Sequence, residues 1–163
     1  MKSVRTGLWL ALGTTLLFAV PSLAAGEKPI NISIFPPIAI AQPADGVSAL
    51  RLDLLYGKNT SVKFLDLGLI NQTTSASNGL QLGTINYNEG SQSGIQLGFV
   101  DYDKGSTNGL QWGAVNYAGD AGGLQLALLN YAEKCHGFQV GAINIIKSGG
   151  MFPVMVIANW GKH

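Results

Sequence analysis

One nine-residue pattern recurs five times in the central part of this chain. Gly79-Leu80-Gln81-Leu82-Gly83-Thr84-Ile85-Asn86-Tyr87 is the first clear copy, and the others begin at Gly94, Gly109, Gly123 and Gly137. The steps between successive first glycines are 15, 15, 14 and 14 residues. Self-similarity at a fixed period is the signature of a repeat architecture, so the repeat constrains the fold more than any single motif does.

Weaker copies extend the repeat in both directions. Residues 65–71 keep the pattern with Asp66 at the Gln position, residues 50–56 keep it with Arg51 there, and residues 153–159 keep the Asn. We therefore predict a repeat domain over residues 48–163 with eight units, which start near residues 49, 64, 79, 94, 109, 123, 137 and 152. A lead-in segment, 25–47, precedes it, and the alternation of Ile30, Ile32 and Ile34 with polar residues predicts a short strand there.

The first 24 residues have the pattern of a bacterial signal peptide. Lys2 and Arg5 form the positive start, an apolar run follows from Leu8 to Val20, and small residues lead to a cleavage site after Ala24. Removing this segment leaves eight basic and nine acidic side chains. We therefore expect an exported protein, in the outer membrane or on the cell surface, with the periplasm as the alternative. Because the mature chain has no basic excess, we expect no nucleic-acid partner.

Short connections separate the repeat cores, and they consist of Gly, Ser, Asn, Asp and Lys, the residues of tight turns. This pattern predicts an all-β fold. Along each core, strict alternation places Leu80, Leu82 and Thr84 on one face. The other face then carries Gln81 and its glycine neighbours together with Ile85 and Tyr87.

Two architectures fit this alternation, and we favour the first. In an antiparallel eight-stranded barrel the oily face points outward into lipid, while Gln and Gly fill the lumen. The repeat cores of nine residues approach the 9–11 residues that a membrane-spanning strand needs. Membrane lipid would then be a partner. The uniformly short connections count against the barrel, because membrane barrels usually have long loops on one side.

In the alternative, each unit is one coil of a β-solenoid with like residues stacked in register. The Gln residues would form one amide ladder and the Asn residues another, and Arg51 would stack on Asp66. The connections supply no regular large apolar residue, which leaves one side of each coil with little to bury.

No catalytic, cofactor-binding or metal-binding residue is predicted, and we expect no enzyme activity. Asp53 and Asp66 share the Gln face, where two acids could serve a glycosidase, but neutralisation by Arg51 is the simpler interpretation. Cys135 and His136 are adjacent, yet a structural metal site needs about four ligands. His163, the other histidine, ends the chain. Cys135 is either a packed free thiol or a link between two chains.

Two further patterns have simple structural interpretations. The tyrosines that end the repeat cores could stack on sugars, but packing against neighbouring glycines is the simpler interpretation. Asn59 and Asn71 each begin an Asn-x-Ser/Thr pattern. The bacterial character of the leader argues against glycosylation there.

The tandem Gly-x-Gln-x-Gly-x-x-Asn units, the degenerate unit 65–71 and the ending 152–160 resemble a family of exported bacterial surface-repeat proteins. The likeness covers residues 30 to 163. It implies a surface or outer-membrane location and no catalytic residue. We therefore expect a non-enzymatic protein with a structural or interaction role and an unidentified surface partner, or alternatively a soluble solenoid for adhesion or ligand binding. An enzyme acting on envelope lipids or glycans is the third hypothesis.

Overall fold

A computed structural model describes residues 25–162, so the predicted leader and His163 lie outside the described residues. The described chain is all-β and forms one continuous sheet. Its strands are β1 (Glu27–Phe35), β2 (Ile38–Ala39), β3 (Gly46–Val62), β4 (Leu65–Leu82), β5 (Ile85–Asn88), β6 (Ser91–Leu97), β7 (Val100–Trp112), β8 (Val115–Ala121), β9 (Leu124–Cys135), β10 (Phe138–Ser148) and β11 (Val154–Trp160). Among residues 25–162, no helix is long and apolar enough to cross a membrane.

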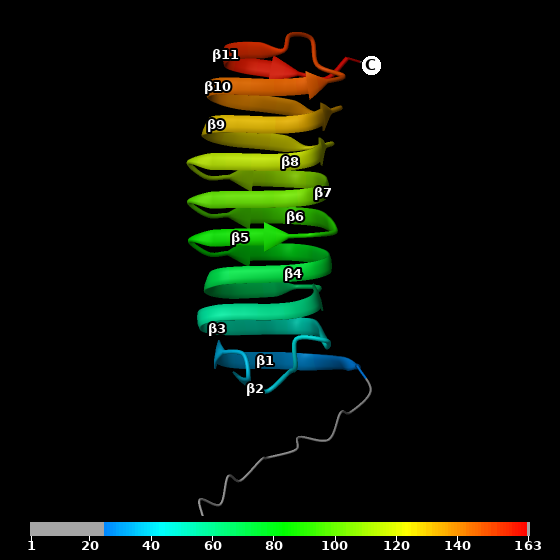
Figure 1. Ribbon diagram of the computed structural model, residues 1–163, viewed down its shortest axis with the longest axis vertical. Helices are drawn as coiled ribbons and strands as arrows, with labels where there is room; N and C mark the ends of the chain where they lie inside the picture. The colour runs from blue at the N-terminus through cyan, green and yellow to red at the C-terminus, as the bar shows by residue number, and fades with distance from the viewer. Residues whose placement is uncertain (1–24, 163) are drawn as a thin grey trace, which may run out of the picture.

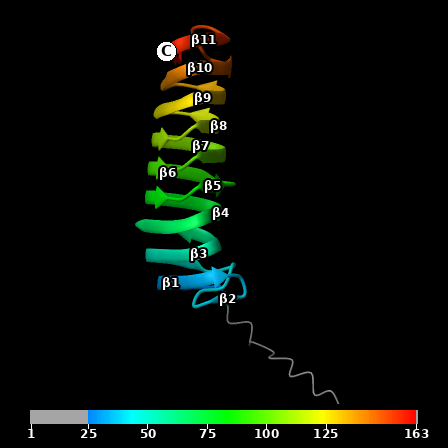
Figure 2. The ribbon, with the colours of Figure 1, turned by 90° about the vertical axis from the view of Figure 1, so that its left-hand side faces the viewer.

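The strands stack as the coils of a β-solenoid of about eight turns, which Figures 1 and 2 show as a narrow column. Every pairing from β3 to β10 is parallel. The register follows the repeat, since Leu65 pairs with Leu50 and Ile95 with Leu80, each fifteen residues earlier. The all-β prediction and its solenoid alternative are therefore confirmed. The favoured barrel is wrong, because consecutive units of a barrel would pair antiparallel.

Each coil has two sides that face one another across a thin interior. One side is a short strand such as β5, and the other is a longer strand such as β6, with a tight turn near Gly90 between them. The chain then turns a corner at Gly98 and Phe99 and enters the next coil. From β5 the side chains of Asn86 and Asn88 point inward, and from β6 those of Gln92 and Gln96 do so.

At the corner of each coil the structure differs from the predicted alternation of side chains. Gln81 is buried as expected, but Ile85 and Tyr87 do not share its face. The bend at Gly83 and Thr84 adds a residue outside the ladder, so the inward parity moves from odd to even positions. Asn86 therefore points inward, while Ile85 and Tyr87 point outward.

The change in period from 15 to 14 residues occurs at the tight turn. Asp103 pairs with Ala118, fifteen residues on, whereas Ser106 pairs with Asp120, fourteen residues on. The residue that is lost therefore lies between these positions, and the ladders on both sides of the coil keep their register.

Both ends of the stack are closed by chain that differs from a regular coil. At the N-terminal end β1 lies parallel to β3, and β2 folds back antiparallel on β1. At the C-terminal end β11 runs antiparallel to β10. The eighth predicted unit is thus a strand, but it reverses direction and covers the edge of the seventh. Covered edges hinder the end-to-end pairing that an open sheet edge invites.

The interior is mostly polar. Buried side chains from Asn31 to Asn159 include six glutamines and nine asparagines, and the buried apolar residues form two small groups near the ends. Ala41, Val47 and Val62 make the group at the N-terminal end. Ala118, Ala121, Ala132, Cys135 and Ile146 make the group at the C-terminal end.

Candidate functional site

The large apolar side chains point outward and collect along one edge of the column. We call this surface the apolar edge. It consists of four columns, each made of the equivalent residues of successive coils. One column lies at the corner of the coils and the others lie beside it, between residues 65 and 143. Its members are Leu65, Leu80, Ile95, Leu110, Leu124 and Phe138; Leu67, Leu82, Leu97, Trp112, Leu126 and Val140; Leu69, Thr84, Phe99, Ala114, Leu128 and Ala142; and Ile70, Ile85, Val100, Val115, Leu129 and Ile143.

No member of the apolar edge is charged. The side chains at the corner extend furthest into solvent: Phe99 is 65% and Leu128 69% exposed, and Trp112 beside the corner is 60% exposed. Contiguous apolar patches larger than a few hundred Å² are rare on soluble monomers and mark interaction surfaces. The apolar edge is therefore the candidate functional surface.

A row of tyrosines borders the apolar edge on one side. The rings of Tyr87, Tyr102, Tyr117 and Tyr131 stack nearly parallel, with centroids 5.3, 4.3 and 5.3 Å apart. Tyr102 and Tyr117 each stack on a tyrosine ring at both faces. The row therefore exposes ring edges and hydroxyl groups rather than ring faces on which a ligand could stack. The sequence predicted packing of these residues against neighbouring glycines, whereas the structure shows tyrosine packed on tyrosine.

Charged side chains lie beyond the tyrosines, at the tight turns. Lys104 lies 5.4 Å from the centre of the Tyr87 ring. Glu133 accepts a 2.8 Å bond from Lys147, and the exposed His136 lies 3.0 Å from Asp120. The column is therefore amphipathic across its width, with an uncharged edge at the corners and a charged edge at the turns.

Beneath this surface, the glutamines form one continuous hydrogen-bond ladder. Each amide nitrogen donates to the carbonyl oxygen of the coil before it, over 2.7–3.1 Å: Gln96 to Gln81, Gln111 to Gln96, Gln125 to Gln111 and Gln139 to Gln125. Gln81 donates to the carboxylate of Asp66, and Arg51 donates two bonds to the same carboxylate. The predicted contact of Arg51 with Asp66 is confirmed.

The asparagines form a second ladder with the opposite direction. Asn71 donates to Asn86 over 2.9 Å, Asn86 to Asp101 over 2.7 Å, and Asn116 to Asn130 over 3.1 Å. Several of these amides also donate to the backbone carbonyl that ends the strand before the corner; Asn71, for example, donates to Leu82. Hydrogen bonds of this kind offset the cost of burying a polar group. This explains how a solenoid can form without a large apolar core.

The first coil differs from the later coils at two positions of the interior. Asp53 stands in the column that glycine occupies in the next coils, and Gly57 stands in the asparagine column. A side chain on Gly57 would collide with the Asp53 carboxylate. The carboxylate of Asp53 therefore fills the space that the ladder asparagine fills elsewhere.

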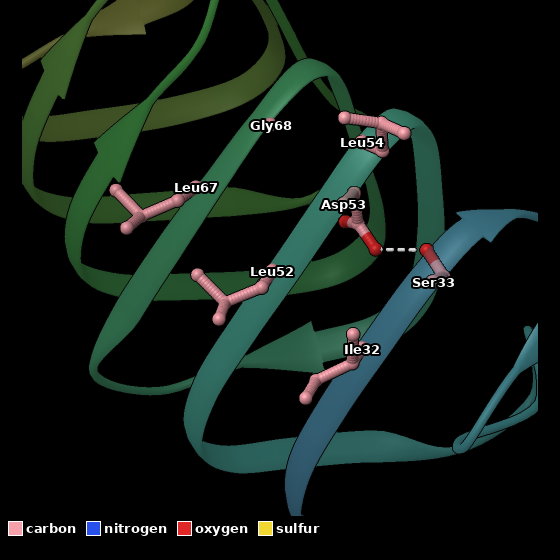
Figure 3. Close-up of a pocket in the computed structure, with 7 residues that line it drawn as sticks. All are labelled: Ile32, Ser33, Leu52, Asp53, Leu54, Leu67 and Gly68. Atoms are coloured by element: carbon pink, nitrogen blue, oxygen red, sulfur yellow. Dashed lines mark hydrogen bonds between the residues drawn. The ribbon is translucent and has the colours of Figure 1, made fainter.

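Asp53 also lines an open hollow of about 320 Å³, together with Ile32, Ser33, Leu52, Leu54, Leu67 and Gly68 (Figure 3). Ser33 donates to its carboxylate, and Arg51 lies 3.1 Å from it. Burial raises the pKa of Asp53, and the bond from Ser33 and the charge of Arg51 oppose that shift. Asp53 and Asp66 are thus both held by Arg51 in the interior, which agrees with neutralisation and leaves no pair of open acids for a glycosidase.

Two more carboxylates are buried on β7. Burial raises the pKa of Asp101 to about 7 and that of Asp103 to about 6. Asp103 accepts hydrogen bonds from four donors, Asn88, Gln96, Thr107 and Gln111. Asp101 accepts one, from Asn86. Sequence reasoning missed both, although an Asp in an otherwise Asn column is visible in the printed repeat.

The remaining sequence candidates lie apart from any site. Cys135 is a buried free thiol, whereas the side chain of its neighbour His136 is exposed. Among the described residues, no group of three potential metal ligands occurs. Asn59 and Asn71 are fully buried, so neither is accessible to a glycan-transferring enzyme.

No family model, curated protein or solved structure matches the chain.

Proposed function

We propose that this chain is a non-enzymatic, exported β-solenoid of the bacterial envelope that lies on a membrane surface with its apolar edge inserted among the lipids. The observation that carries the proposal is the cross-section of the column. Uncharged apolar residues occupy the corners, tyrosines follow, and charged residues stand at the turns. This is the polarity profile of a membrane interface, at which tyrosine rings sit between the acyl region and water.

The dimensions of the edge agree with this profile. From the corner residue Phe99 to the tyrosine Tyr102 the chain advances three residues, or about 10 Å at the rise of an extended strand. Interfacial helices insert their apolar faces to a depth of about 5–10 Å. Six coils at the spacing of hydrogen-bonded strands give the edge a length of roughly 25 Å. The edge is convex, so a lipid surface, which can deform around it, accommodates it more readily than a flat protein surface.

The charge distribution predicts which lipids support binding. Apolar contact is the driving force, because the apolar edge carries no charge and the chain outside the leader has no basic excess. We therefore expect binding to zwitterionic as well as anionic vesicles, with little dependence on salt. The part of the proposal that concerns export rests only on the signal-peptide pattern at residues 1–24.

Trp112 on the apolar edge is a built-in reporter for the test. The protein recovered from the exporting cell, carrying Trp160→Phe, is mixed with phosphatidylcholine vesicles, with or without bromine on the acyl chains. We expect the Trp112 emission to shift to the blue and to be quenched by the brominated lipid. The charged variant Phe99→Lys with Leu128→Lys should lose both signals. The control Glu89→Lys, at a tight turn, changes the net charge by the same two units and should keep them.

Three outcomes would overturn the proposal: no binding to either kind of vesicle, equal binding by the charged variant and its control, or absence of quenching in the wild-type protein together with a stable complex with another protein through the same edge. Circular dichroism of both variants verifies that the coils are intact. The location is tested separately, by sequencing the N-terminus of the recovered protein and by washing envelope membranes with carbonate.

A further inference from the structure

The asparagine ladder is interrupted at one step, between Asp101 and Asn116. At every complete step, a side-chain N–H of one coil donates to the side-chain oxygen of the next. Asp101 Oδ2 takes the position of the donating nitrogen, but an ionised carboxylate has no proton to donate. Asp101 Oδ2 and Asn116 Oδ1 are both buried without a hydrogen-bond partner.

The corner glycines show that these two oxygens occupy the places of a ladder donor and acceptor. A Cβ placed on Gly98 would lie 2.6 Å from Asp101 Oδ1 and 2.8 Å from Asn86 Nδ2, the two atoms of a ladder bond. A Cβ on Gly113, one coil on, would lie 3.0 Å from Asn116 Oδ1 and 3.3 Å from Asp101 Oδ2. The same corner that holds a donor and an acceptor at Gly98 therefore holds two oxygens at Gly113.

We propose that Asp101 is a neutral carboxylic acid in the folded protein, whose Oδ2–H donates to Asn116 Oδ1 and completes the asparagine ladder. A protonated Asp has the shape of Asn, with a hydroxyl in place of the amide nitrogen. The proton makes the ladder continuous from Asn71 to Asn144. The same site makes the stability of the solenoid depend on pH, because deprotonation puts two buried oxygens against one another.

The surroundings of Asp101 favour the neutral form. The charged group nearest along its own strand is Asp103, which repels a second negative charge. β5 and β8 present the amides of Asn86 and Asn116, while the tyrosines of these strands point outward. From the strands across the interior the amides of Gln96 and Gln111 reach Asp103 rather than Asp101. Arg51, the one fully buried basic side chain among the described residues, is three coils away and is held by Asp66.

The direction of the pH effect follows from these pKa values. The pKa of Asp101 is about 7 in the folded protein and about 3.8 when the chain is unfolded, so the folded state binds the proton more tightly. The stabilising contribution is complete below pH ~4 and is lost as the pH rises towards 7. Above that range the contribution stays absent.

Two variants on the same strand separate this proposal from a general effect of burial. Asp101→Asn supplies the missing donor at every pH. Asp103→Asn instead replaces an acceptor, which four donors contact, with an amide that brings N–H groups against them. Both positions are fully buried and both carboxyls have raised pKa values, so a role for burial alone predicts the same sign for both variants.

The test is urea unfolding of the wild-type protein and the two variants at pH 4 and pH 8, followed by circular dichroism. At pH 8 we expect the unfolding constant of Asp101→Asn to be at least about tenfold smaller than that of the wild type, and at pH 4 to be within about twofold of it. Asp103→Asn should unfold more readily at pH 8. In the infrared spectrum at pH 6, the protonated carboxylic acid band should be weaker in Asp101→Asn than in the wild type, because only Asp103, whose pKa is about 6, then contributes to it. Asp103→Asn should keep the band of Asp101.

Other results would overturn the proposal. If Asp101→Asn destabilises the protein at pH 8, the carboxylate is ionised and its oxygen is satisfied in another way, for example by a bridging water. If the two variants stabilise equally, hydrogen-bond direction has no part in the effect. If Asp101→Asn does not fold, the infrared band of Asp103→Asn, followed as a function of pH, still decides whether Asp101 titrates near neutrality, and absence of that band would overturn the proposal.

Discussion

The guanidinium group of Arg51 donates to both oxygens of Asp66, over 2.6 and 2.5 Å, and both side chains are buried. Gln81 donates to the same carboxylate. The pair thus ends the glutamine ladder with an acceptor whose charge Arg51 balances. Four further glutamines continue the ladder, so the charged residues Arg51 and Asp66 of this column are followed by uncharged amides in the later coils.

This arrangement predicts that the ion pair can be replaced only as a unit. Asp66→Gln alone leaves a buried guanidinium without its main partner and should cost about 3–5 kcal/mol of unfolding free energy. Arg51 also lies 3.1 Å from the buried Asp53 carboxylate, so these variants are made in an Asp53→Asn background. There the double variant Arg51→Gln with Asp66→Gln extends the amide ladder by two coils and should be more stable than the single variant. Urea unfolding of the Asp53→Asn background, both single variants and the double variant measures the coupling. A double variant less stable than Asp66→Gln would contradict this account of the ladder.

The first glycine of each unit is predicted to be less replaceable than the glycine at the corner. Gly109 has φ 145°, and a Cβ there would lie 1.9 Å from the Gly94 carbonyl oxygen. At the corner, Ala127 already occupies the column of Gly113. We expect Gly109→Ala to prevent folding or to lower the unfolding free energy by about 3 kcal/mol or more, and Gly113→Ala to cost less. Thermal unfolding of the two variants checks the order, and an equal loss would argue against steric specificity at Gly109.

Removal of β11, which covers the edge of β10, should cause the chains to associate with one another. Truncation after Lys147 deletes β11 and leaves the edge of β10 without its antiparallel partner. An uncovered parallel edge is a template for pairing with another sheet. We expect the truncated chain to form higher oligomers in sedimentation experiments at concentrations where the full chain does not. A truncated chain that is folded by circular dichroism and stays in the oligomeric state of the full chain would show that β11 has no protective role.

The Cys135 thiol is predicted to react slowly in the native protein. It is buried, and burial raises its pKa, so the reactive thiolate is scarce near neutral pH. Labelling with a maleimide should be slow in buffer and rapid in denaturant, and non-reducing gels should show no cross-linked chain. Fast native labelling would mean that the C-terminal coils open readily. A cross-linked dimer would support the intermolecular disulfide that the sequence left open.

Much of the fold could be predicted from the sequence because the repeat is regular. The position of every unit, the all-β class, the inward Gln residues and the Arg51–Asp66 contact follow from the period and from alternation within a strand. The choice of architecture could not be predicted with the same security. The apolar positions are outward in a barrel as well as in this solenoid, so they do not distinguish the two. The objection to a solenoid assumed an apolar core, whereas the structure pairs most of its buried amides through ladders.

The apolar edge could also be predicted only in part from the sequence. Leu80 and Leu82 could be placed on an oily face, but Ile85 was assigned to the opposite face because the bend at Gly83 and Thr84 does not appear in a simple alternation. The apolar edge exists only because that bend brings two apolar columns together around a corner. Asp101 could be noticed as an exception in the Asn column, yet its missing donor is apparent only once the direction of the ladder is known.

The sequence by itself determined the period, the residue types in each column and the positions of the turns, because these are properties of neighbours along the chain. The tertiary structure decided that successive units stack in parallel and that like side chains therefore meet. Stacking places like amides of successive coils about 4.8 Å apart, so that most of the buried amides can hydrogen-bond to the next coil. Only this stacking makes a run of polar residues into a stable interior.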